Sequence, residues 1–88
     1  MKQLNQSIEP NPLRQAIFEM IRMRHDRSFC PSEVVRWIFP QDWELFMQDV
    51  REEMMEMYRE GLILVTQKGN AIDPSTEPKG PVRISRKK

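Results

Sequence analysis

The 88-residue chain has one cysteine, three glycines and no long apolar run. A single cysteine excludes an internal disulfide, so we expect packing alone to stabilise the fold. No segment approaches the roughly 20 apolar residues that a membrane-spanning helix requires, and no membrane partner is expected. Residues 1–6 lack the apolar core of a signal peptide, which favours a cytoplasmic location.

Excess charge of one sign is also missing. The chain has 14 basic and 13 acidic side chains, so the net charge is +1. This balance excludes binding driven by bulk charge, such as a polybasic arm would give. The hydrophobic fraction of 39% and the charged fraction of 31% are typical of a globular protein, and the length fits one domain.

Motifs for catalysis are absent as well. The chain has no Gly-rich phosphate loop and no G-x-S-x-G element. His25 and Cys30 are its only His or Cys side chains, whereas a structural zinc site needs about four ligands. We therefore expect a non-catalytic protein with no catalytic residue, no metal, no cofactor and no small-molecule substrate.

Three segments have the spacing of amphipathic helices. The first covers residues 12–24, with Asn11 as N-cap, and the second begins at Pro31 and ends before Pro40. The third covers residues 43–60, with Asp42 as N-cap and Gly61 after its last turn. Their apolar stripes predict one shared core, to which we assign Ile17, Ile38, Trp43, Val50 and Met54.

After Gly61 the pattern changes to that of strands. Residues 62–66 are apolar and partly β-branched, residues 68–70 predict a turn in which Gly69 and Asn70 take positive φ, and residues 71–73 return. Residues 81–85 alternate as a last strand, and Phe29 lies in a candidate short strand. We therefore divide the chain into an N-terminal arm (residues 1–11), a winged-helix domain (residues 12–85) and a basic tail (residues 86–88).

This element order predicts an α+β winged helix, in which a three-helix helix-turn-helix core precedes a C-terminal β-hairpin wing. The alternative is a three-helix bundle with an unrelated hairpin. We favour the winged helix because an isolated hairpin is marginally stable and needs a third strand or a helix to cover it.

Short motifs also occur in a characteristic order: CPSEV at residues 30–34, VTQKG at 65–69 and GPVR at 80–83. With these motifs, residues 12–85 resemble a small bacterial winged-helix family known as domain of unknown function 3253. The resemblance implies a winged-helix fold and a cytoplasmic bacterial protein. It implies no activity, substrate or catalytic residue.

One functional hypothesis is nucleic-acid binding. The third helix would be the recognition helix, on which Gln48 can pair with adenine and Arg51 with guanine or phosphate. Residues 42–60 contain seven acidic and two basic side chains, however, and such a helix is repelled by a polyanion. Residues 61–88 contain six basic and two acidic side chains. The wing and tail are thus the better contact surface, and the candidate residues are Gln48, Arg51, Lys68, Lys79, Arg83, Arg86, Lys87 and Lys88.

The second hypothesis is a protein partner or a homodimer at the outward face of the third helix. Leu45 and Met55 are predicted to be exposed there, beside Glu52 and Glu56. Arg51 has no acidic residue one helical turn away, which leaves its charge free for another contact. Cys30 begins the second helix, and we expect a half-buried, unreactive thiol rather than a thiolate activated by the helix dipole.

Overall fold

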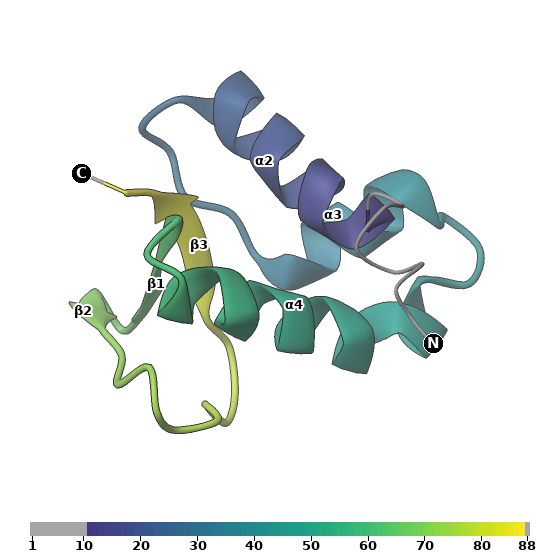
Figure 1. Cartoon of the computed structure of the whole chain (residues 1–88). Helices are drawn as coiled ribbons and strands as arrows, with labels where there is room; N and C mark the ends of the chain where they lie inside the picture. Colours follow the sequence, from purple (N-terminus) through teal and green to yellow (C-terminus); the bar gives the residue numbers. More distant parts are fainter. Residues whose placement is uncertain (1–10, 88) are drawn as a thin grey trace, which may run out of the picture.

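A computed structural model describes residues 11–87 of the chain (Figure 1). The helices are α2 (Pro12–Arg24), α3 (Pro31–Ile38), the 3-10 helix η1 (Trp43–Phe46) and α4 (Met47–Arg59), and the strands are β1 (Ile63–Gln67), β2 (Asn70–Ala71) and β3 (Arg83–Arg86). The α-helices pack on one another, and the sheet lies beside the C-terminal end of α4 (Figure 1). The prediction of an α+β fold is confirmed, and the arrangement is compatible with a winged helix. The predicted arm lies outside the described residues except for Asn11.

Helix α2 begins as the sequence predicts. The side-chain oxygen of Asn11 accepts hydrogen bonds from the backbone N–H groups of Leu13 at 2.9 Å and Arg14 at 3.4 Å. Pro12 occupies the first turn, where its missing N–H leaves no bond unmade. The capped start fixes where this helix meets α4.

Helix α3 also begins at its predicted residue. The backbone N–H of Cys30 donates to the Glu33 carboxylate at 3.0 Å, and Arg24 of α2 binds the same carboxylate at 2.7 Å. The Cys30 bond and, more weakly, Arg24 hold the pKa of Glu33 below its ordinary value. This carboxylate therefore joins the start of α3 to the end of α2.

The third predicted helix is divided into two parts. A 3-10 turn, η1, precedes α4, and Asp42 makes no side-chain capping bond. In a 3-10 turn the side chains three residues apart lie on one side, so Trp43 and Phe46 both face α3. The Phe46 ring stacks on Phe39 with centroids 4.1 Å apart, and the Arg36 guanidinium lies 4.2 Å from the Trp43 ring centroid. These contacts explain the tighter turn.

The three strands form an antiparallel sheet in the order β2-β1-β3. A bridge between Phe29 and Ile84 confirms the short strand predicted around Phe29. Our assignment of positive φ to Asn70 is wrong: Asn70 pairs with Gln67 in the sheet, and Lys68 and Gly69 have φ of 54° and 84°. The register leaves only two residues for the turn, and their φ angles are those of a type I′ turn, which needs positive φ at both. The last strand includes Arg86, one residue beyond its predicted end.

The core lies where the three helices meet the sheet. Ile17, Val50 and Met54 are fully buried, as predicted, whereas Ile38 and Trp43 are only partly buried and pack against the core from its edge. The buried apolar set is completed by Leu13, Ala16, Met20, Phe29, Val34, Val35, Met55, Met57, Ile63, Val65, Val82 and Ile84.

Candidate functional site

Helix α4 is buried over more of its circumference than its sequence indicates. Met55 is 1% exposed, so its predicted place on an outward interaction face is wrong. One turn earlier on the same side, Arg51 donates to the backbone carbonyls of Pro78 and Gly80 at 2.9 and 3.1 Å. The loop between β2 and β3 thus returns over this side of the helix. Leu45, by contrast, is 76% exposed, as predicted.

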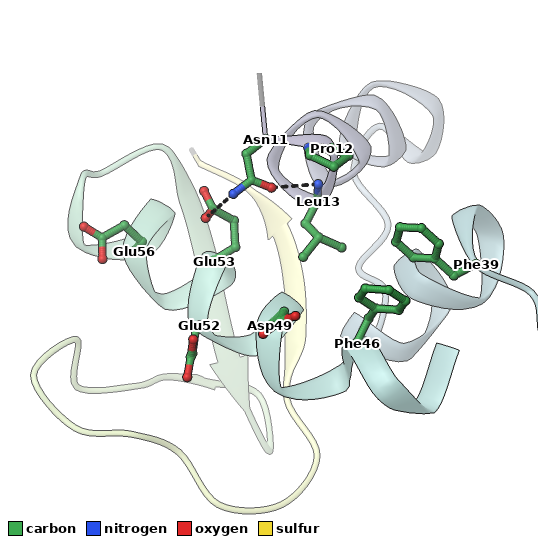
Figure 2. Close-up of a pocket in the computed structure, with 9 residues that line it drawn as sticks. All are labelled: Asn11, Pro12, Leu13, Phe39, Phe46, Asp49, Glu52, Glu53 and Glu56. Carbon is green, nitrogen blue, oxygen red and sulfur yellow. Dashed lines mark hydrogen bonds between the residues drawn. The ribbon is translucent and has the colours of Figure 1, made fainter. Parts of the chain in front are cut away.

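The side of α4 that stays accessible borders a groove of about 670 Å³, which we call the acidic groove. The start of α2 forms one wall (Figure 2). Figure 2 shows the rings of Phe39 and Phe46 at one end and the α4 carboxylates spread toward the other. The groove is lined by Asn11, Pro12, Leu13, Phe39 and Phe46, and by the carboxylates of Asp49, Glu52, Glu53 and Glu56.

Arg14 compensates part of this negative charge. Its Nε donates to Glu53, and its two terminal nitrogens donate to the Glu60 carboxylate at 3.0 and 2.9 Å. These bonds hold the pKa of Glu60 below its ordinary value. Glu53 also accepts from the Asn11 side chain at 3.0 Å. These two carboxylates therefore connect α4 to α2.

The other carboxylates are less compensated. Glu56 lies 3.9 Å from Arg59, and such an exposed pair contributes little. Glu52 accepts one bond from neutral Gln48 at 3.0 Å. Asp49 has no side-chain hydrogen bond or ion pair within residues 11–87. The apolar end of the groove consequently adjoins negative charge that no described cation neutralises.

Four of the predicted nucleic-acid contacts have internal partners instead. Gln48 binds Glu52, and Arg51 binds two carbonyls of the loop, which orient its guanidinium without neutralising its charge. Arg83 donates to the hydroxyl and carbonyl of Ser28, both at 2.9 Å, and to Cys30 Sγ at 3.3 Å. Arg86 forms an ion pair with Asp26 at 2.6 Å. Each of these four side chains thus has a partner within the protein.

The predicted lysines are placed differently. Lys68 is at the tip of the β1–β2 hairpin, and Gln67 donates to the Lys79 carbonyl at 2.6 Å, which brings the two lysines to one end of the sheet. Lys87 lies near Gly61, at the opposite end of β1. All three side chains are exposed, and Lys88 lies outside the described residues. The lysines therefore do not form one continuous strip.

Sequence reasoning missed most of the groove. Of its lining residues, the sequence predicts Glu52 and Glu56 as interaction residues and Asn11 as a helix cap. The available signal was Asp49, which precedes Glu52 by three residues and therefore shares its helix face. No pattern indicated that the start of α2 would complete the groove, because that contact joins residues about 40 positions apart.

No described helix is long and apolar enough to cross a membrane. Within residues 11–87, no group of three or more His, Cys, Asp or Glu side chains could hold a metal ion. A family model with the description "Protein of unknown function (DUF3253)" matches residues 10–87. No curated protein matches the chain.

Proposed function

The chain belongs to the DUF3253 family, whose function is unknown, and we propose that it is a non-catalytic protein-interaction module that binds a basic segment of a partner in the acidic groove. The family match extends over nearly the whole chain but transfers no activity. The proposal therefore rests on the surface of the protein itself.

One observation carries the proposal. The acidic groove combines an apolar end, formed by Phe39 and Phe46, with the carboxylates of Asp49 and Glu52, which no described cation neutralises. Apolar side chains of a partner can be buried at the first part, and lysines or arginines are attracted to the second. A nucleic acid would bring phosphates toward the same carboxylates and would be repelled.

Nucleic-acid binding through the wing is a second candidate. It is supported by the proximity of Lys68 and Lys79 at one end of the sheet, where both side chains are exposed. The internal bonds of Arg51, Arg83 and Arg86 weaken this candidate, because a phosphate would have to replace them. A homodimer, a cytoplasmic location and a bacterial source stay predictions.

The two candidates are separated by titrating 15N-labelled protein with an octalysine peptide and, separately, with a 20-base-pair DNA duplex. We expect octalysine to shift the amide resonances of residues 46–56, and the duplex to leave them in place. Glu52→Gln should weaken octalysine binding about two- to fivefold at low salt, because one attractive charge is lost.

The matched control is Glu77→Gln, which removes one exposed carboxylate from the loop between β2 and β3 and should leave the octalysine affinity unchanged. Saturable binding of the duplex with shifts confined to the region of Lys68 and Lys79, together with no octalysine shifts on α4, would replace the first candidate by the second. Equal effects of the two Gln variants would also overturn the acidic groove as the binding site.

A further inference from the structure

A second hollow lies between α2 and α3, and we call it the aromatic groove. It has a volume of about 700 Å³, and its lining includes Phe18 of α2 and Trp37 of α3. These side chains are 42% and 46% exposed, which is unusual for two large aromatic groups that line one hollow. Accessible aromatic side chains in a concave site are common anchors of protein–protein interfaces.

The aromatic groove carries no uncompensated charge from its lining. Its one carboxylate, Glu19, forms an ion pair with Arg22, which holds the pKa of Glu19 below its ordinary value. Gln15 is neutral, and the other lining residues are apolar. Lysine or arginine therefore gains little here, whereas an apolar side chain can cover the two rings.

The two grooves adjoin, and we call the pair the joined grooves. Pro12 and Phe39 line both of them, so a ligand that crosses these two residues contacts the aromatic groove on one side and the acidic groove on the other. The chemistry changes along that path, from apolar and neutral beside Trp37 to negative beside Asp49 and Glu52. A ligand that fits both parts must change in the same way.

We propose that the joined grooves bind one bipartite peptide segment of a partner protein, with an aromatic or large aliphatic anchor over Phe18 and Trp37 and a run of lysines or arginines beside Asp49 and Glu52. This inference rests on the proposed function and adds the class of partner. An acidic peptide fits only the first part, and a purely basic peptide fits only the second.

The probe is a library of random 12-residue peptides displayed on phage and selected on the full-length protein. We expect enriched peptides to carry one or two large apolar residues separated from a cluster of lysines or arginines. Synthetic peptides from the selection are then titrated against Trp37→Ala and against the double variant Asp49→Asn/Glu52→Gln. Trp37→Ala should weaken binding about tenfold or more without changing its salt dependence. The double variant should weaken binding mainly at low salt and flatten the salt dependence.

The matched control is Met23→Ala, since Met23 is on α2, is 46% exposed like Trp37 and does not line either groove. Its affinity should equal that of the wild type. Far-UV circular dichroism and thermal melting verify that the variants are folded, and Phe18→Ala replaces Trp37→Ala if the latter is not.

The outcomes separate this inference from the function on which it rests. Enriched peptides that are basic but contain no apolar anchor, and that bind Trp37→Ala normally, would overturn the bipartite segment and leave the interaction module in place. Acidic peptides, or no enrichment, would overturn both. Self-association in analytical ultracentrifugation that Trp37→Ala abolishes would assign the aromatic groove to a second copy and overturn the bipartite segment.

Discussion

Along the accessible side of α4, the carboxylates of Asp49 and Glu52 have no cation among residues 11–87, whereas the two arginines of the sheet are bonded to the protein itself. Arg83 of β3 binds the hydroxyl and carbonyl of Ser28, and Arg86 of the same strand binds Asp26. The region with the larger formal positive charge thus offers fewer free cations than its sequence indicates. Formal charge measures what a segment contains, and only the contacts show what remains available to a partner.

The largest difference is expected between a buried residue of α4, Met55, and an exposed residue of η1, Leu45. Met55→Ala should lower the free energy of unfolding by about 2–5 kcal/mol, because it leaves a cavity in the core. Leu45→Ala should change it by less than about 0.5 kcal/mol, because the leucine is mostly in solvent. Urea denaturation measures both values. Equal losses would contradict the burial that distinguishes the two residues.

The second effect concerns carboxylates that do have a cation. Arg14→Met keeps the apolar stem but leaves Glu53 and Glu60 without their cation. It should lower the free energy of unfolding by about 1–2 kcal/mol. The control is Arg22→Met on the same helix, where the pair with Glu19 is exposed and contributes little to stability. Urea denaturation of the two variants in parallel measures the loss in the free energy of unfolding. A loss for Arg14→Met no larger than that for Arg22→Met would show that Arg14 does not join α2 to α4.

The third prediction tests whether Arg51, which connects α4 to the loop between β2 and β3, is structural. Arg51→Met removes the bonds to the carbonyls of Pro78 and Gly80 and should cost about 1 kcal/mol. Amide hydrogen exchange should become faster in residues 78–82, while the far-UV circular dichroism of the helices stays unchanged. Lys79→Met in the same loop is the control and should leave exchange as it is. If amide exchange is unchanged in the Arg51 variant, Arg51 does not hold the loop and its guanidinium is available to a ligand.

A smaller effect depends on pH. Because the pKa of Glu33 is lower in the folded protein than its ordinary value of 4.5, this carboxylate contributes stability that is present above about pH 4.5 and is lost as the pH falls through the folded pKa. Glu33→Gln keeps an acceptor for the Cys30 N–H but removes the charge. Its stability should be lower than that of the wild type at pH 7 by less than about 1 kcal/mol, since the side chain is partly exposed.

The comparison is made by denaturation at pH 7 and at pH 3. The difference between the wild type and Glu33→Gln should shrink at the lower pH, because the charge-dependent part of the wild-type stability is lost as the pH falls toward the folded pKa of Glu33. A difference that stays constant across this range would assign the effect to packing rather than to charge.

Local signals explain what could be predicted from the sequence. Asn11, Pro12 and Pro31 mark helix starts by short-range chemistry, and the structure places both helices at those residues. Gly61 with φ of 78° ends α4 for a similar local reason. The apolar stripe of α4 likewise identified Val50 and Met54 as core residues.

Contacts between distant segments explain what could not be predicted. Met55 is buried on the side of α4 where Arg51 binds a loop more than 20 residues later in the chain, and helical periodicity contains no information about that loop. The acidic groove exists because the start of α2 lies beside α4, about 40 residues away. The partners of Arg83 and Arg86 are 50 or more residues away, so their charges looked free in the sequence.

The smallest expected change in the free energy of unfolding concerns the uncompensated carboxylates of α4. Glu52 lies one helical turn from Asp49 on one side and from Glu56 on the other, and like charges at this spacing destabilise a helix by about 0.2–0.5 kcal/mol. Glu52→Gln should therefore raise the free energy of unfolding by about that amount at low salt, while its amide oxygen still accepts from Gln48. The gain should disappear in 1 M salt, where such repulsion is screened. Glu77→Gln, without acidic neighbours on a helix, should show no gain under either condition. A loss of stability in the Glu52 variant would mean that this carboxylate has a structural role, and the contrast between the accessible side of α4 and the bonded arginines of the sheet would no longer hold.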